Sequence, residues 1–143
     1  MPTLPPILYH ATPARHWARI RREGLTALPV YLASERMAWY YASTIAEDDH
    51  EPAIVLAIPR DALDPSALEP DHPGIAEPIT TVLATSEVAI HAAWAAVAGT
   101  WEDSWGLVES VRYRHPIPSA HLRDPVHTVL PPGPTASCRS RRR

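Results

Sequence analysis

Two short segments near the amino terminus constrain the fold most. Residues 8–12 (LYHAT) and residues 30–34 (VYLAS) each begin with apolar residues and end with polar ones. Each is followed by a stretch with helical periodicity, so each predicts a β-strand that leads directly into a helix. If the two strand ends lie side by side, their polar residues and the nearby aromatic rings form a cleft. A cleft of that kind suits a nucleotide-like ligand.

The length and composition predict one domain with one core. The chain has 143 residues, of which 45% are hydrophobic, which is enough to bury a single core. The formal net charge of -3 argues against a protein that coats nucleic acid. The single cysteine, Cys138, allows no internal disulfide and no cysteine-based metal site, which fits a cytoplasmic protein. We expect no signal peptide and no membrane association, because the longest nearly uncharged stretch, 88–100, is too short and broken to span a bilayer.

Apolar runs and capping residues predict the elements of the first sixty residues. Thr12 is expected to cap a first helix, with Pro13 at its first position and Gly24 at its end. Ser34 is expected to cap a second helix. The expected strands cover residues 7–10, 30–33 and 53–58, the last a continuous apolar run typical of a buried strand.

The rest of the chain is rich in proline and predicts fewer elements. The order of strands and helices, with no Gly-rich first turn, predicts an α+β domain with a split antiparallel sheet rather than a doubly wound fold. The domain is expected to cover residues 1–123, and residues 124–143 a flexible tail rich in Pro and Arg. The other expected elements are a long loop at 59–78, a strand at 80–84, a helix at 87–98, a turn-rich loop at 101–106 and a strand at 107–117.

Three segments resemble, in order, the motifs of the ADP-ribosyltransferase superfamily. Residues 10–12 (HAT), followed by a helix and residues 23–25 (EGL), resemble the first motif. Residues 30–35 (VYLASE), with Tyr41 in the next helix, resemble the second, and residues 109–114 (ESVRYR) resemble the third. The set is similar to a small bacterial or phage member of the His–Tyr–Glu type. The resemblance spans most of the chain and implies the split antiparallel sheet of that superfamily.

The resemblance also implies an enzyme that uses NAD. Such an enzyme moves ADP-ribose from NAD to a protein or nucleic acid and releases nicotinamide, through an oxocarbenium-like sugar. Tyr31 and Tyr41 would pack on the two faces of the nicotinamide ring, and Glu109 would orient the ribose and stabilise the sugar cation. The implied catalytic residues are Glu109, His10 and Tyr31. The implied NAD-binding residues are His10, Ala11, Thr12, Tyr31, Ser34 and Tyr41, with Ala11 standing where the superfamily usually has Gly.

Purely structural roles for these residues also stay open. Helix capping alone explains Thr12, and Tyr31 and Tyr41 can equally be core residues. Glu102 and Asp103, which lie close to Glu109 in the sequence, and Glu87, at the start of an expected helix, are rival catalytic carboxylates.

Other classes of protein also stay open. The same segments resemble the RNA 2'-phosphotransferases, which share the fold and need cations to grip a phosphate; Arg36, Arg112 and Arg114 are the candidates. A non-catalytic module that binds NAD or a nucleotide would have nearly the same sequence. A metal site is not expected, since no histidine pair has His-x-x-x-His spacing. Small transferases of this type include toxins and effectors, which would be paired with an antitoxin or immunity protein.

Overall fold

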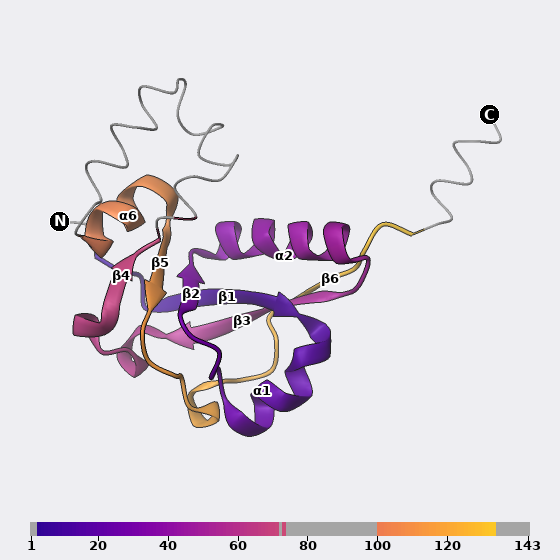
Figure 1. The fold of residues 1–143 in the computed structure, drawn as a ribbon, viewed down its shortest axis with the longest axis horizontal. Helices are drawn as coiled ribbons and strands as arrows, with labels where there is room; N and C mark the ends of the chain where they lie inside the picture. Colours follow the sequence, from indigo (N-terminus) through magenta and orange to yellow (C-terminus); the bar gives the residue numbers. More distant parts are fainter. Residues whose placement is uncertain (1–2, 72, 74–99, 134–143) are drawn as a thin grey trace, which may run out of the picture.

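A six-stranded antiparallel sheet with helices on both faces forms the protein (Figure 1). The computed structural model describes residues 3–71, 73 and 100–133. The strands are β1 (Ile7–Pro13), β2 (Val30–Ala33), β3 (Ala53–Pro59), β4 (Leu68–Pro70), β5 (Ser110–Tyr113) and β6 (His127–Val129), in the spatial order β4-β5-β2-β1-β3-β6. The helices are α1 (Trp17–Glu23), α2 (Glu35–Asp49) and α6 (Trp101–Val108), with short 3-10 turns at Ala14–His16, Arg60–Ala62, Pro65–Ala67 and Ser119–His121. The α+β class with an antiparallel sheet is therefore confirmed.

The strand β3 is buried on both faces, as its continuous apolar run predicted. Leu56 and Ile58 are fully buried in the larger core, together with Leu8 of β1. On the other face, Ala53 and Val55 pack under α2. Each large side chain buried in this way stabilises the fold by about 1.5–3 kcal/mol relative to an exposed one. The two apolar layers hold α1 and α2 against opposite faces of the sheet.

The joint between β1 and β2 has the fewest paired residues of any joint in the sheet. The strands β1 and β3 pair at seven positions, and β2 and β5 pair at four. Across the β1–β2 joint, only Tyr9 and Ala33 are in register. Beside that pair, the His10 side chain donates a hydrogen bond from Nδ1 to the Tyr31 carbonyl oxygen at 2.7 Å. A hydrogen bond from a side chain therefore links the two strands next to their single registered pair.

The helix α2 begins where the sequence predicts and lies close to the sheet. Ser34 caps it, with its hydroxyl oxygen accepting from the Met37 N–H at 3.4 Å. Ala38, Ala42 and Ala46 follow one another at four-residue spacing and are all buried, so they share one face of the helix. Because these side chains are small, α2 approaches β1 and β3 closely (Figure 1).

The expected start of the first helix is wrong. Thr12 does not cap a helix and Pro13 is not the first helical residue; both belong to β1, where Thr12 pairs with Ile54 of β3. The α-helix begins only at Trp17, after a 3-10 turn. Long-range pairing with β3 therefore overrides the local capping signal. The expected end is right, because Gly24 follows the helix with a φ of 85°.

Residues 101–106 are helical, although a loop was expected there. They form most of α6, which packs against β4 and β5 and buries Ser104, Trp105 and Val108. The expected strand at 107–117 is correspondingly shorter, since α6 takes its first residues and β5 ends at Tyr113.

Two short edge strands were not expected. The strand β4 lies within the expected loop at 59–78 and pairs with β5. The strand β6 lies within the expected tail at 124–143 and pairs with β3, so the sheet extends beyond residue 123. Both are three residues long and follow proline-rich sequence, which leaves no periodicity to detect. The expected strand at 80–84 and helix at 87–98 lie outside the described residues. Within the described part of the chain, no helix is long and apolar enough to cross a membrane.

Gly24 should not tolerate a side chain. A Cβ there would meet the Ile117 carbonyl oxygen and the Ser119 main-chain nitrogen, and the φ of 85° is unfavourable for L-residues. We expect Gly24→Ala to lower the free energy of unfolding by roughly 2–4 kcal/mol, measured by urea denaturation. The matched control is Gly106→Ala in α6, where nothing lies within 4 Å of an added Cβ. That change should raise stability by up to about 1 kcal/mol, and equal effects at the two positions would contradict the expectation.

Candidate functional site

A cavity of about 320 Å³ lies where β1 and β2 part. The strands β1 and β2 supply much of its wall, α2 contributes Ala38 and Tyr41, and β5 contributes Ser110. The lining is mostly aromatic and apolar with a few polar groups, as in sites for small organic ligands. The residues that line it are Tyr9, His10, Ala11, Tyr31, Leu32, Ala33, Ala38, Tyr41, Asp71, Pro73 and Ser110.

His10 reaches the cavity as a neutral imidazole with a defined tautomer. Its Nδ1 lies 2.7 Å from the Tyr31 carbonyl oxygen, and because a carbonyl only accepts, Nδ1 carries the hydrogen. Burial lowers the pKa of His10, and the hydrogen bond to Tyr31 opposes that effect only in part. The ring is therefore neutral at pH 7, and Nε2 is left as a hydrogen-bond acceptor.

Three tyrosines supply the aromatic lining. Tyr31 is 41% exposed, whereas Tyr41 is partly buried against the core under α2. The neighbouring Tyr40 is exposed and contacts the Tyr41 ring edge-on, with centroids 5.6 Å apart, so Tyr41 is the one of the two that lines the cavity. Burial, with a smaller contribution from Glu35, raises the pKa of Tyr9. Tyr9 is accordingly an uncharged phenol at neutral pH.

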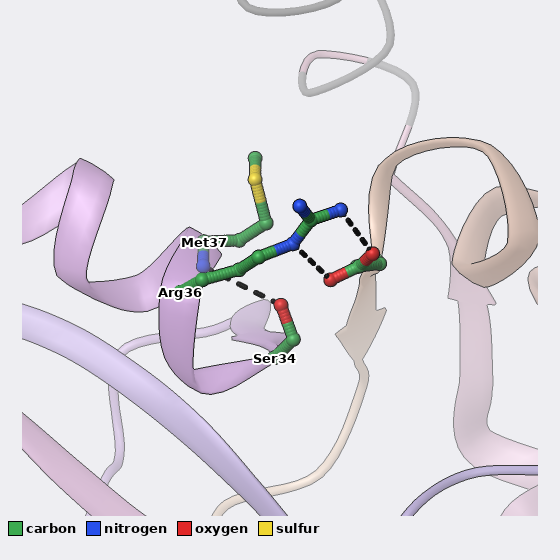
Figure 2. A network of polar contacts seen from close by, with 4 residues as sticks. Ser34, Arg36 and Met37 are labelled. Carbon is green, nitrogen blue, oxygen red and sulfur yellow. Dashed lines mark hydrogen bonds and ion pairs between the residues drawn. The ribbon is translucent and has the colours of Figure 1, made fainter. Parts of the chain in front are cut away.

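Glu109 lies between α6 and β5 and is bound to the start of α2. Its carbonyl oxygen accepts from the Ser34 N–H at 2.9 Å. Arg36 binds both oxygens of its carboxylate, with Nε donating to Oε1 at 2.9 Å and Nη2 paired with Oε2. Figure 2 shows Arg36 reaching from the first turn of α2, beside the Ser34 hydroxyl that caps Met37. The bond from Arg36 is the main cause that lowers the pKa of Glu109, so the carboxylate is ionised at neutral pH.

The cavity brings together four of the seven residues that the sequence predicted. His10, Ala11, Tyr31 and Tyr41 all line it. Three lie outside the lining. Thr12 is buried, with its hydroxyl 3.4 Å from His16 Nδ1. Ser34 caps α2, and Glu109 directly precedes the lining residue Ser110.

The expected origin of the cleft is wrong in one respect. The sequence predicted two strand ends side by side, but β1 and β2 are antiparallel, so their carboxyl ends point in opposite directions. The middle of β1, around Tyr9 and His10, instead lies beside β2. The polar and aromatic residues meet because the strands part there, not because both strands end there.

Sequence reasoning missed Asp71 and Ser110. Asp71 is only 3% exposed, and its Oδ2 accepts a hydrogen bond from the Ser110 hydroxyl at 2.5 Å. The Ser104 hydroxyl accepts from the Asp71 N–H at 3.0 Å and donates to the Ser110 carbonyl oxygen at 2.8 Å. No local pattern marks these residues, because the pairing of β4 with β5 is what brings Asp71 to the cavity.

Two of the rival carboxylates, Glu102 and Asp103, do not line the cavity, and the third, Glu87, lies outside the described residues. Asp103 accepts from the Thr100 hydroxyl at 2.8 Å in the first turn of α6. Glu102 lines a different hollow, beside Leu63 and Trp101. Among residues 3–71, 73 and 100–133, no three His, Cys, Asp or Glu side chains are grouped to hold a metal ion.

Comparison with known proteins adds no assignment. No protein-family model matches the chain, and no curated protein matches it. The functional argument therefore depends on the geometry of the cavity and on the chemistry of the residues around it.

The ion pair between Arg36 and Glu109 should make stability depend on pH. The folded-state pKa of Glu109 lies below its usual value, so the pair stabilises the fold above the usual range of a Glu carboxyl, near 4.3, and that stabilisation is lost as the pH falls through the folded pKa. We expect Arg36→Gln to lower the urea midpoint modestly at pH 7 and to have no effect once Glu109 is protonated. Urea unfolding from pH 7 to pH 2.5 measures this. A deficit of the same size at every pH would show that Arg36 acts through packing instead.

Proposed function

We propose that the protein is an ADP-ribosyltransferase that transfers ADP-ribose from NAD to a protein or nucleic acid and releases nicotinamide. One observation carries the proposal. His10, Tyr31 and Tyr41, which come from two of the three motifs that resemble this superfamily, line a single cavity. Glu109, from the third motif, directly precedes a lining residue on the next strand. The proposal includes the split antiparallel sheet of that superfamily. The single registered pair between β1 and β2 supports it, because a split sheet has little pairing at its centre.

The residues of the cavity suit the nicotinamide end of NAD. A pyridinium ring packs well on tyrosine faces, and such a contact contributes about 1–2 kcal/mol once water is removed. The Ala11 main chain is positioned to pair with the carboxamide, since it lines the cavity and carries both a donor and an acceptor. His10 accepts a hydrogen bond from a ribose hydroxyl at Nε2, because its Nδ1 hydrogen is already donated to Tyr31.

Glu109 supplies negative charge to the ribose in this proposal. The sugar becomes cationic as the bond to nicotinamide breaks, and a fixed carboxylate stabilises that charge. Arg36 does not use up the carboxylate, because each oxygen has two lone pairs and the guanidinium takes one from each. The remaining lone pairs can accept from the ribose 2'-hydroxyl.

The three candidate arginines do not favour the phosphotransferase alternative. Arg36 is paired with Glu109, and both Arg112 and Arg114 are paired with Glu69. None of the three lines the cavity. A phosphate-binding site built from these three arginines would compete with the carboxylates that already pair with them.

Glu109→Gln should abolish the release of nicotinamide from NAD. We expect the rate to fall by about 100-fold or more, because a neutral amide does not stabilise the sugar cation. Chromatographic assay of nicotinamide with the purified chain measures this. Glu47→Gln, an exposed position in the last turns of α2, is the matched control and should retain the full rate. Undiminished release by Glu109→Gln would contradict the assignment of Glu109.

Labelled NAD should identify the acceptor. We expect the label from the adenosine half of NAD to become attached to macromolecules of a bacterial lysate, and digestion with protease or nuclease then shows which class carries it. NAD consumption that requires 2'-phosphorylated RNA would indicate a phosphotransferase. Binding of NAD without any consumption would indicate a non-catalytic module.

A further inference from the structure

The outer face of α1 carries a group of exposed arginines. Ile20 is buried in the larger core and Trp17 packs against that core, so the opposite face of the helix points to solvent. Arg19, Arg21 and Arg22 are all exposed. Arg19 and Arg22 lie three residues apart, which places their side chains next to one another, and Arg21 flanks them. The three positive charges therefore lie within about one turn of helix.

These three arginines, which we call the arginine face, have no acidic partner in the part of the chain that the structure describes. They take part in none of the ion pairs formed there. Arg15, in the 3-10 turn before α1, is different, because it is paired with Glu51. Glu23, the last residue of α1, is a single carboxylate beside three guanidinium groups. The arginine face therefore keeps a net positive charge.

His16, at the start of α1, responds to this charge. Burial is the main cause that lowers the pKa of His16, and the positive charges of Arg15 and Arg19 lower it further, whereas Glu51 acts in the opposite direction. The two arginines together outweigh the carboxylate at this position. The potential beside the helix is thus positive even at the end where Glu51 lies.

We infer that the arginine face binds the phosphate backbone of a nucleic acid. The formal net charge of the whole chain is -3, so the attraction for a polyanion does not extend over the whole molecule. Like charges at this spacing destabilise a helix. A bound polyanion removes that repulsion, which gives the arrangement a physical reason that an ordinary solvated helix face lacks.

Arginines on one short stretch of helix suit phosphates better than they suit the carboxylates of a protein. A guanidinium group donates paired hydrogen bonds to phosphate oxygens. Successive phosphates of one strand carry regularly spaced charges, so neighbouring arginines can contact them together. Binding also releases the counterions condensed on the nucleic acid, which favours association.

The arginine face lies apart from the cavity. The helices α1 and α2 pack against opposite faces of the sheet (Figure 1), and it is α2 that contributes to the wall of the cavity. The inference therefore goes beyond the proposed function and does not depend on it. Where both hold, the arginine face retains a nucleic acid on the chain and favours it over a protein as the acceptor.

Fluorescence anisotropy with the full chain tests the inference. The probes are labelled single-stranded DNA of roughly 20 nucleotides and RNA of the same sequence, titrated at salt concentrations from about 50 to about 200 mM. The triple variant Arg19→Gln, Arg21→Gln, Arg22→Gln should bind at least about tenfold more weakly, and its salt slope should be smaller by about 2, since each contact with a single strand contributes about 0.7. The variant Arg19→Lys, Arg21→Lys, Arg22→Lys keeps the charges and should keep the slope.

The matched control removes three positive charges elsewhere. Arg141→Gln, Arg142→Gln, Arg143→Gln changes the net charge by the same amount at the end of the chain and should keep the affinity to within about threefold. An equal loss of affinity in this control and in the helix variant would overturn the inference, because net charge alone would then govern binding. Binding of neither nucleic acid by the unaltered chain would overturn it as well. Equally tight binding of poly-glutamate would assign the arginine face to acidic proteins instead.

Folding of the variants is checked by urea denaturation, and Gln and Lys are both good helix formers. If the Gln variant does not fold, the main-chain amide resonances of Arg19, Arg21 and Arg22 in the unaltered chain replace it. They should shift as DNA is added, and unmoved resonances would overturn the inference. None of these measurements involves the release of nicotinamide, so failure of the inference leaves the proposed function standing.

Discussion

The hydrogen bond from His10 to the Tyr31 carbonyl is the interaction on which the cavity depends. At the joint of β1 and β2, one registered pair and this imidazole hold the two strands together. A single hydrogen bond contributes about 0.5–1.5 kcal/mol net, which is less than the continuous pairing that β1 makes with β3. The sheet thus has little main-chain pairing at its centre, and residues of both strands at this joint line the cavity. The same bond fixes the tautomer that leaves Nε2 as an acceptor.

The first turn of α2 organises the other side of the site. Ser34 caps the helix with its hydroxyl and binds the Glu109 carbonyl with its N–H. Two residues later, Arg36 fixes the Glu109 carboxylate. The alanine face of the helix then lets Tyr41 come close enough to the sheet to line the cavity. One helix start therefore positions an aromatic wall and a carboxylate together, although these lie far apart in the sequence.

The sequence predicted those elements whose signals are local, and missed those that depend on pairing. The Ser34 cap and the apolar run of β3 each lie within the element they define, and both are confirmed. Thr12 had an equally good local signal, but pairing with Ile54 extends β1 through it. The helix α6 did carry a signal that was overlooked. It has acidic residues in its first turn and buries Trp105 and Val108 on one face.

The same distinction between local signals and long-range pairing applies to the residues of the candidate site. The convergence of His10, Tyr31 and Tyr41 could be predicted, because each lies on an element with a strong local pattern and the elements are close in sequence. Asp71 could not, because a three-residue edge strand places it, and its register on β5 is set by contacts across about forty residues. Such strands have too few residues to show a period. Local patterns therefore predicted the aromatic wall of the cavity, whereas the position of Asp71 depends on a long-range strand pairing that is seen only in the folded chain.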